Sequence, residues 1–206
     1  GVGLILPVMA IIQAIGFFFG HGSGNFISRS LGARDFSHAE RMAATGGICA
    51  ALFGLVLLAA GVVFRGGLLA LLGARDGLVD AATIGYASDY LTFILCGAPF
   101  MCLSCVLNNQ LRFQGNADFA MIGLVSGAVL NCVLDPIFIF IFGLEVRGAA
   151  LATMLSQIVS CALLYIGTLR SDNLKLRLIN FTPSAYYLKN ICIGGLPSLC
   201  RQALAS

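Results

Sequence analysis

Long apolar stretches alternate with short polar ones along this chain, and the apolar stretches have the length that crosses a bilayer. A spanning α-helix needs about 20 consecutive, mostly apolar residues. Five stretches meet that requirement, and a sixth begins near Ile191. The five predicted spans are Leu4–Ile27, Ala43–Phe64, Ile84–Leu111, Phe119–Phe142 and Gly148–Leu169. The pattern therefore predicts an all-α integral membrane protein, a polytopic helical bundle with five full spans and the start of a sixth.

Composition strengthens this prediction. Of the 206 residues, 59% are hydrophobic and 10% are charged, with a mean hydropathy of +0.95. Soluble domains are nearer one quarter charged. The net charge of +3 is too small to indicate a nucleic-acid surface, so we expect a lipid bilayer and no nucleic acid as a partner. Because the chain starts at Gly1 and stops within an apolar segment, we expect it to be part of a longer protein.

Basic residues gather in alternate loops. The first, third and fifth loops hold eight Arg or Lys residues, whereas the second and fourth hold three. The positive-inside rule then places the odd-numbered loops in the cytoplasm and the protein in the inner (plasma) membrane as a multi-pass protein. The fifth loop is the longest and most charged, so we predict a boundary between residues 1–180 and 181–206 there. Thr182 followed by Pro183 predicts an N-cap at the start of the last helix.

One acid lies inside the fourth predicted span. Asp135 is a costly residue in a membrane, at about 2.5–3.5 kcal/mol on insertion scales. Asn131 is one helical turn away on the same face, and Pro136 removes a backbone donor from that turn. The resulting oxygen ligands suit Na⁺, and the acid alone suits H⁺. The alternative is a hydrogen bond between helices with no ion.

Residues at the same predicted depth in the membrane as Asp135 are further candidates for the cation site. Thr153 and Asp135 lie at similar distances from the connection between the fourth and fifth spans, so we expect their side chains at one level. Asp89 and Tyr90 lie at a comparable level, where a hydrogen bond or interfacial anchor would explain them. His21 is the other titratable group inside a span, and we favour a hydrogen-bonded neutral His over a proton relay.

No pattern indicates an enzyme or a cofactor site. Cys102 and Cys105 form a CxxC, but no second pair accompanies them, and all eight cysteines lie in apolar runs, which is typical of helix packing. No HExxH motif and no Ser-His-Asp arrangement is present. We therefore expect no catalytic residues, no cofactor, and no metal other than Na⁺ at Asp135 and Asn131.

Five motifs in order resemble the MATE (multidrug and toxic compound extrusion) transporters, particularly their DinF/MepA-like bacterial branch. The motifs are similar to the first cytoplasmic loop, the LRxQGN loop, the NxxLDPxFIF helix, the helix that follows it and the start of the second lobe. They lie at Ser28–Asp35, Leu111–Asn116, Asn131–Phe140, Gly148–Gln157 and Ile193–Ser198.

The resemblance implies a fold of twelve helices in two six-helix lobes. This chain would supply helices two to six of the amino-terminal lobe and the start of helix seven, so the first helix and the second lobe would be its missing partners. The resemblance also implies antiport, in which Na⁺ or H⁺ entry drives export of drugs or other amphipathic, often cationic, small molecules. Its cation site would hold Asp135, Asn131 and Thr153, with Tyr90 as a weaker match, while His21 departs from the small residue that the family has.

Three other functions stay open from the sequence. A flippase for lipid-linked sugars, in the same superfamily, should carry several bases in its cavity to hold pyrophosphate; outside loops and span ends the chain has only Arg201. An intramembrane enzyme should show paired catalytic groups at one depth. A truncated, inactive lobe is the third.

Overall fold

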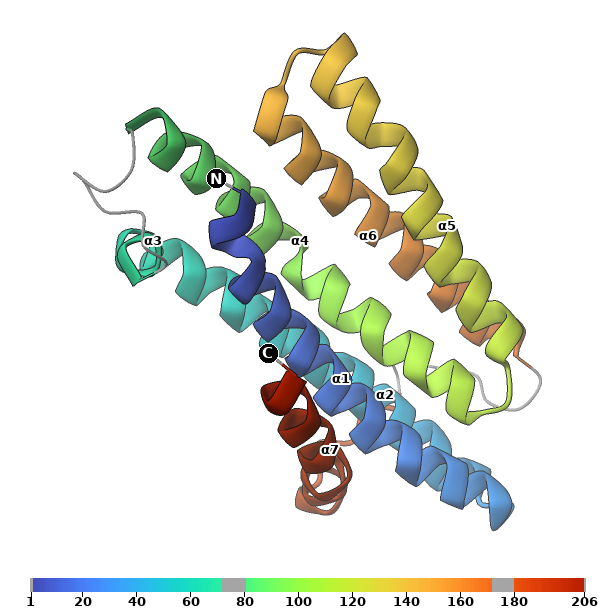
Figure 1. Ribbon diagram of the computed structural model, residues 1–206. Helices are drawn as coiled ribbons and strands as arrows, with labels where there is room; N and C mark the ends of the chain where they lie inside the picture. Colours follow the sequence, from blue (N-terminus) through green and yellow to red (C-terminus); the bar gives the residue numbers. More distant parts are fainter. Residues whose placement is uncertain (1, 72–80, 172–179, 206) are drawn as a thin grey trace.

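The computed structural model describes residues 2–71, 81–171 and 180–205, and within these ranges every long element is a helix (Figure 1). The elements in chain order are α1 (Val2–Gly32), α2 (Phe36–Val63), α3 (Arg65–Leu71), α4 (Ala81–Phe113), α5 (Ala117–Pro136), the π-helix η1 (Ile137–Ile141), α6 (Glu145–Arg170) and α7 (Ala185–Ala205).

Five of these elements have the length and composition of membrane spans, as the sequence predicts. The spans run over Ile5–Gly32, Phe36–Val63, Ile84–Phe113, Ala117–Ile141 and Glu145–Arg170. Most are longer than predicted because the helices continue into the polar loops. The backbone hydrogen bonds of the helix extend beyond the last apolar residue, so hydropathy underestimates the length. The short helix α3 occupies part of the predicted second loop. Residues 72–80 and 172–179 of the second and fifth loops lie outside the described residues.

Helix α4 is the centre of the bundle. It packs against α1, α2 and α6, while α5 packs mainly on α6 at the edge (Figure 1). Gln110 of α4 is fully buried and its Nε2 donates to Ser23 Oγ of α1 at 3.1 Å and to the Ala43 carbonyl of α2 at 3.2 Å. Interhelical hydrogen bonds of this kind hold membrane helices together because lipid offers no hydrophobic drive for their association.

Small residues allow the helices to approach closely. A Cβ atom added to Gly54 of α2 would lie 2.5 Å from the Cα of Pro99 in α4, so this crossing requires glycine. The face of α5 that meets α6 is built in the same way from Ala120, Gly123 and Gly127, and Ser160 Oγ of α6 donates to the Gly123 carbonyl at 2.9 Å. The α5–α6 hairpin therefore forms a unit that is laid against α4.

The connections between spans have defined ends. At the end of α4, Gly115 adopts a φ of +86°, and the Asn116 N–H donates to the Leu111 carbonyl at 2.9 Å. Asp35 caps α2 by accepting a hydrogen bond from the His38 backbone N–H at 3.2 Å, and this bond lowers the pKa of the Asp35 carboxyl below its usual value. Both connections lie at the end of the bundle that the sequence predicts to be cytoplasmic.

The last helix differs from its predicted start. Thr182 is not the N-cap of α7: its carbonyl accepts from Thr45 Oγ1 of α2 at 3.2 Å, and Ser184 Oγ accepts from the Tyr186 N–H at 3.3 Å instead. The helix starts at Ala185 because Ser184, two residues later than predicted, supplies the capping oxygen. Helix α7 then packs on α1.

Candidate cation site and polar cavity

The fourth span changes its helical form beside the buried acid. Pro136 has no backbone N–H, and the next residue, Ile137, donates to the Leu134 carbonyl instead of continuing the α-helical pattern. Residues Ile137–Ile141 then form a π-helix, in which the Phe142 N–H reaches back five residues to the Ile137 carbonyl at 3.1 Å. Such π-helical turns are rare and occur mostly at functional sites. Pro136 thus marks a local irregularity directly after Asp135.

Three predicted site residues come together at this irregularity. Asn131 Nδ2 lies 3.4 Å from Asp135 Oδ1 and 3.4 Å from Thr153 Oγ1, so the amide bridges α5 and α6. Thr153 Oγ1 also donates to the Ala149 carbonyl of its own helix at 2.9 Å. All three side chains are only partly buried. The two bonds made by Asn131 are long, which leaves room for the amide to turn and present its oxygen.

Tyr90 lies close to this cluster from a third helix. It is 5% exposed on α4, and its phenol is near enough to the Asp135 carboxylate for an electrostatic interaction. No direct hydrogen bond joins Tyr90 to Asp135, so its place is beside the cluster rather than within it. The neighbouring Asp89 points elsewhere and pairs with Arg147, as described below.

A polar cavity of about 350 Å³ adjoins the cluster between α1, α4, α5 and α6. Asn131 and Thr153 form part of its wall, so both residues belong to the cavity wall as well as to the cluster around Asp135. Most other polar groups in the wall are neutral, and Arg112, near its other end, is the only charged residue among those that line it. The neutral polar residues are Gln13, Ser104, Asn108, Ser156, Gln157 and Ser160.

Two polar features of this cavity, one hydrogen bond and one buried hydroxyl without a partner, could not be found from the hydropathy pattern. Gln157 Oε1 accepts from Ser104 Oγ at 3.2 Å, which joins α6 to α4. Ser156 Oγ is buried with no hydrogen-bond partner. Their spacing in the sequence is a signal that could have found them. Polar residues stand at i, i+3, i+4 and i+7 on one face of α6, at Thr153, Ser156, Gln157 and Ser160.

His21 lies away from the cluster, at the contact between α1 and α7. Its Nδ1 is 3.0 Å from the Phe17 carbonyl of its own helix and 3.4 Å from Ser198 Oγ. Cys102 makes a 3.6 Å contact with the Ile12 carbonyl, which is a packing role. Across the described parts of the chain, no group of three or more His, Cys, Asp or Glu residues could hold a metal ion.

Comparison with known proteins agrees with this architecture. The MatE family model matches residues 1–137, which is more than half of the chain. This chain belongs to the MATE family. Curated relatives include proteins named Multidrug export protein MepA from Staphylococcus aureus, 34% identical over 207 residues, and from Staphylococcus saprophyticus, 33% identical over 204 residues. Each alignment covers 98% of this MATE chain and 44% of the relative, so the chain spans less than half the length of these proteins.

Solved structures of MATE transporters superpose closely on this chain. An inward-facing multidrug resistance MATE transporter matches with a TM-score of 0.89 at 33% identity, and an outward-facing one with 0.87 at 34%. A MOP superfamily transporter from Pyrococcus furiosus also matches with 0.87 at 34%; for that protein, reverse polarity of the binding pocket suggests a different function. These matches cover 98% of this chain and 45%, 44% and 44% of the other chains. The predicted family and helical membrane fold are therefore confirmed.

Proposed function

We propose that this MATE chain is the greater part of the amino-terminal lobe of a cation-coupled multidrug exporter, in which Na⁺ or H⁺ binds at Asp135 while a substrate binds in the adjoining cavity. The observation that carries the proposal is the shared wall: Asn131 and Thr153 belong both to the cluster around Asp135 and to the cavity. Residues 1–180 would form this partial lobe, and residues 181–206 the linker and the start of the second lobe.

The cluster can exist in two hydrogen-bonding states. In the structure, the Asn131 amide nitrogen donates toward Asp135 and Thr153, which suits an ionised carboxylate without a cation. A Na⁺ ion would need oxygen from all three residues, so the amide would turn to present Oδ1. A proton on Asp135 would have the same effect, because a protonated acid donates to that oxygen. Either cation also removes the cost of a bare carboxylate in the membrane.

Turning Asn131 changes the wall of the cavity, and this is how cation binding would reach the substrate. The cavity presents mostly neutral polar groups and apolar surface, a lining that suits amphipathic compounds. A ligand shifts an equilibrium only through a difference in its affinity for the two states. Substrate and cation would therefore favour opposite orientations of Asn131, which is the requirement for exchange.

The similarity to both inward-facing and outward-facing transporters supports movement of this lobe as one body. With the short connections α1–α2 and α4–α5 in the cytoplasm, Asp135 would lie in the outer half of the membrane. The helices that this chain lacks relative to its relatives would complete the cavity.

Export by the full-length protein in liposomes tests the proposal. We would follow efflux of an ethidium-type dye under a Na⁺ gradient at constant pH, and separately under a pH gradient without Na⁺. Asp135→Asn should abolish gradient-driven export, whereas Asp118→Asn, an exposed acid at the other end of α5, should not. The gradient that drives export identifies the coupling ion.

Two results would contradict the proposal. Unchanged export in a folded Asp135→Asn protein would make Asp135 a packing residue. Absence of dye export by the wild type under either gradient would exclude multidrug export, and transport of a lipid-linked sugar would then be the activity to measure.

A further inference from the structure

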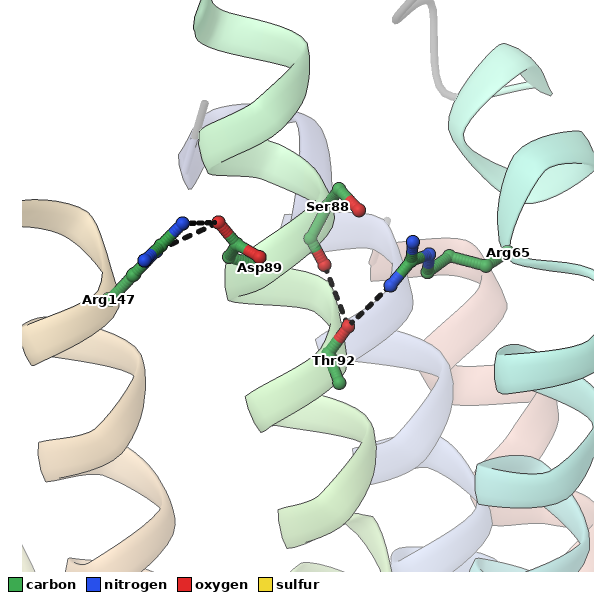
Figure 2. Close-up of polar contacts among 5 residues, drawn as sticks. All are labelled: Arg65, Ser88, Asp89, Thr92 and Arg147. Carbon is green, nitrogen blue, oxygen red and sulfur yellow. Dashed lines mark hydrogen bonds and ion pairs between the residues drawn. The ribbon is translucent and has the colours of Figure 1, made fainter.

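An ion pair at the predicted outer end joins α4 to α6. Arg147 Nε and Nη2 lie 2.8 Å and 2.6 Å from Asp89 Oδ2 (Figure 2). Figure 2 shows the pair reaching across from one helix to the other, with Arg65 on the opposite side of α4. Among the described residues this pair is the only salt bridge between two helices.

Local helix stability does not explain Arg147. It lies in the first turn of α6, which begins at Glu145. The helix dipole disfavours a cation at that end. The backbone there is also held in an unfavourable form, because Glu145 has a φ of +48°. Arg147 is stabilised by its ion pair with Asp89 of α4. This contact between helices therefore accounts for an arginine at the start of α6.

The pair belongs to a small cluster that ties the start of α6 to the start of α4. Tyr86, one turn before Tyr90, interacts with Glu145 and is also close to Arg147. The charged and titratable groups that meet here are thus Tyr86, Asp89, Glu145 and Arg147. Two of them come from α4 and two from the turn that starts α6.

This cluster lies beside the cation-site residues, on the side of the predicted outer end. Asp89 precedes Tyr90, the α4 residue beside Asp135, and Arg147 is six residues before Thr153, a rise of ~9 Å along α6. The same two helices, α4 and α6, flank the site. Asp135 and Thr153 are partly buried in the structure, and separating the two helices at this end would widen the access of water to them.

We propose that Asp89 and Arg147 form a latch that closes the cation site at its outer end, and that the latch opens when the site exchanges its cation with that side. The inference rests on the proposed function. Asp89 and Arg147 are positioning residues here: they touch neither the cation nor the substrate. The Arg147 side chain is 59% exposed, which suits a contact that forms and breaks.

Chemical accessibility of Asp135 tests the latch without requiring transport. We would treat the full-length protein in lipid nanodiscs, at one pH, with a water-soluble carbodiimide and an amine, and measure amide formation at Asp135 by peptide mass spectrometry. Asp89→Asn and Arg147→Gln should each speed labelling roughly five-fold, which corresponds to losing about 1 kcal/mol of ion-pair stability. The swap of Asp89→Arg with Arg147→Asp should restore slow labelling.

Arg65→Gln is the matched control. Arg65 has the same charge, contacts α4 through Thr92 Oγ1 at 3.4 Å, and faces the other side of that helix (Figure 2). Its substitution should leave labelling of Asp135 unchanged. If the single variants do not fold, the neutral pair Asp89→Asn with Arg147→Gln keeps similar shapes and should label as fast as predicted for either single change.

Three outcomes would overturn the latch: unchanged labelling in both single variants, equal acceleration by Arg65→Gln, or a swapped pair that labels as fast as the single variants. None of these depends on whether Asp135 carries the coupling ion. A failed latch with Asp135-dependent export, or an intact latch with Asp135-independent export, would therefore separate this inference from the proposed function.

Discussion

Helices α4 and α5 are consecutive in sequence and both are apolar enough to span a membrane, but they have opposite roles in the bundle. In their most apolar stretches, 61% of the α4 residues are buried against 6% of those in α5. Gln110, in the last turn of α4, makes two interhelical bonds at 3.1 Å and 3.2 Å. Asn131 on α5 makes one interhelical bond, to Thr153 of α6, and one bond to Asp135 of its own helix, both at 3.4 Å. Tight pairing belongs to the helix that holds the bundle together, and loose pairing to the helix with the acid.

The proposed cation site gives this difference a reason, because it would separate stability from exchange. A site that must bind and release a cation cannot be locked by short, saturated hydrogen bonds, because each would have to break in every cycle. Placing such a site on a peripheral helix leaves the central contacts undisturbed when it changes. Three substitutions test this division, and a fourth prediction concerns the connection between α1 and α2.

The largest expected effect is on the α2–α4 crossing. Gly54→Leu should lower the free energy of unfolding by about 3 kcal/mol, the upper end of what overpacking costs, because its side chain would meet the Pro99 backbone. Thermal unfolding of the detergent-solubilised full-length protein measures the change. Gly67→Leu on α3 is the control, since nothing lies within 4 Å of a Cβ there. Equal destabilisation by both variants would contradict the importance of the crossing.

The next effect concerns the interhelical bonds of α4. Gln110→Met should cost about 1 kcal/mol, because it removes the two bonds to α1 and α2. The neighbouring Asn109 is also buried, but its Nδ2 donates only to the Cys105 carbonyl of its own helix. Asn109→Leu should therefore cost less in the same unfolding measurement. A reversed order would show that bonding between helices is not what makes α4 central.

On α5 the expected pattern is the opposite. Asn131→Leu should change the free energy of unfolding by less than about 0.5 kcal/mol, since long polar contacts in membranes contribute little. Gradient-driven export should fall at least roughly ten-fold, the effect of losing about 1.4 kcal/mol of coupling. Cys132→Ala, on the exposed side of the same turn, should leave both quantities unchanged. An Asn131→Leu protein that unfolds readily would place Asn131 with the structural residues.

Hydropathy and spacing were sufficient for the membrane spans, whereas the two-lobe MATE fold was implied by the family resemblance. The five spans, their order and the contact between Asn131, Asp135 and Thr153 all followed from apolar length, helical period and depth. They follow because a bilayer sets the length of every helix and an α-helix sets which side chains share a face. The role of these residues as a cation site stays a prediction.

The features that the sequence did not predict depend on contacts between residues that are far apart in the chain. The pairing of Arg147 with Asp89 joins residues 58 positions apart, and each alone is typical of a membrane interface. The π-helix after Pro136 was missed because a proline removes a hydrogen bond without specifying which new register the backbone adopts. The start of α7 was misplaced by two residues because Thr182 and Ser184 both carry a capping oxygen, and only the course of the chain past α2 decides between them.

The smallest expected effect lies at the connection between α1 and α2, outside the membrane. Asp35 accepts the His38 backbone N–H, and His38 Nδ1 lies 2.9 Å from Asp35 Oδ2; the backbone bond, together with the side-chain one, lowers the pKa of Asp35. A lowered pKa in the folded state means that the cap contributes stability above the unfolded value, about 3.9, and loses it as the pH falls through the folded value. The wild type should therefore lose slightly more thermal stability below about pH 4 than Asp35→Asn, which keeps a capping oxygen that cannot titrate. Melting curves from pH 7 to pH 3 measure the difference, and parallel curves for the two proteins would show that Asp35 does not cap α2 as an ionised group.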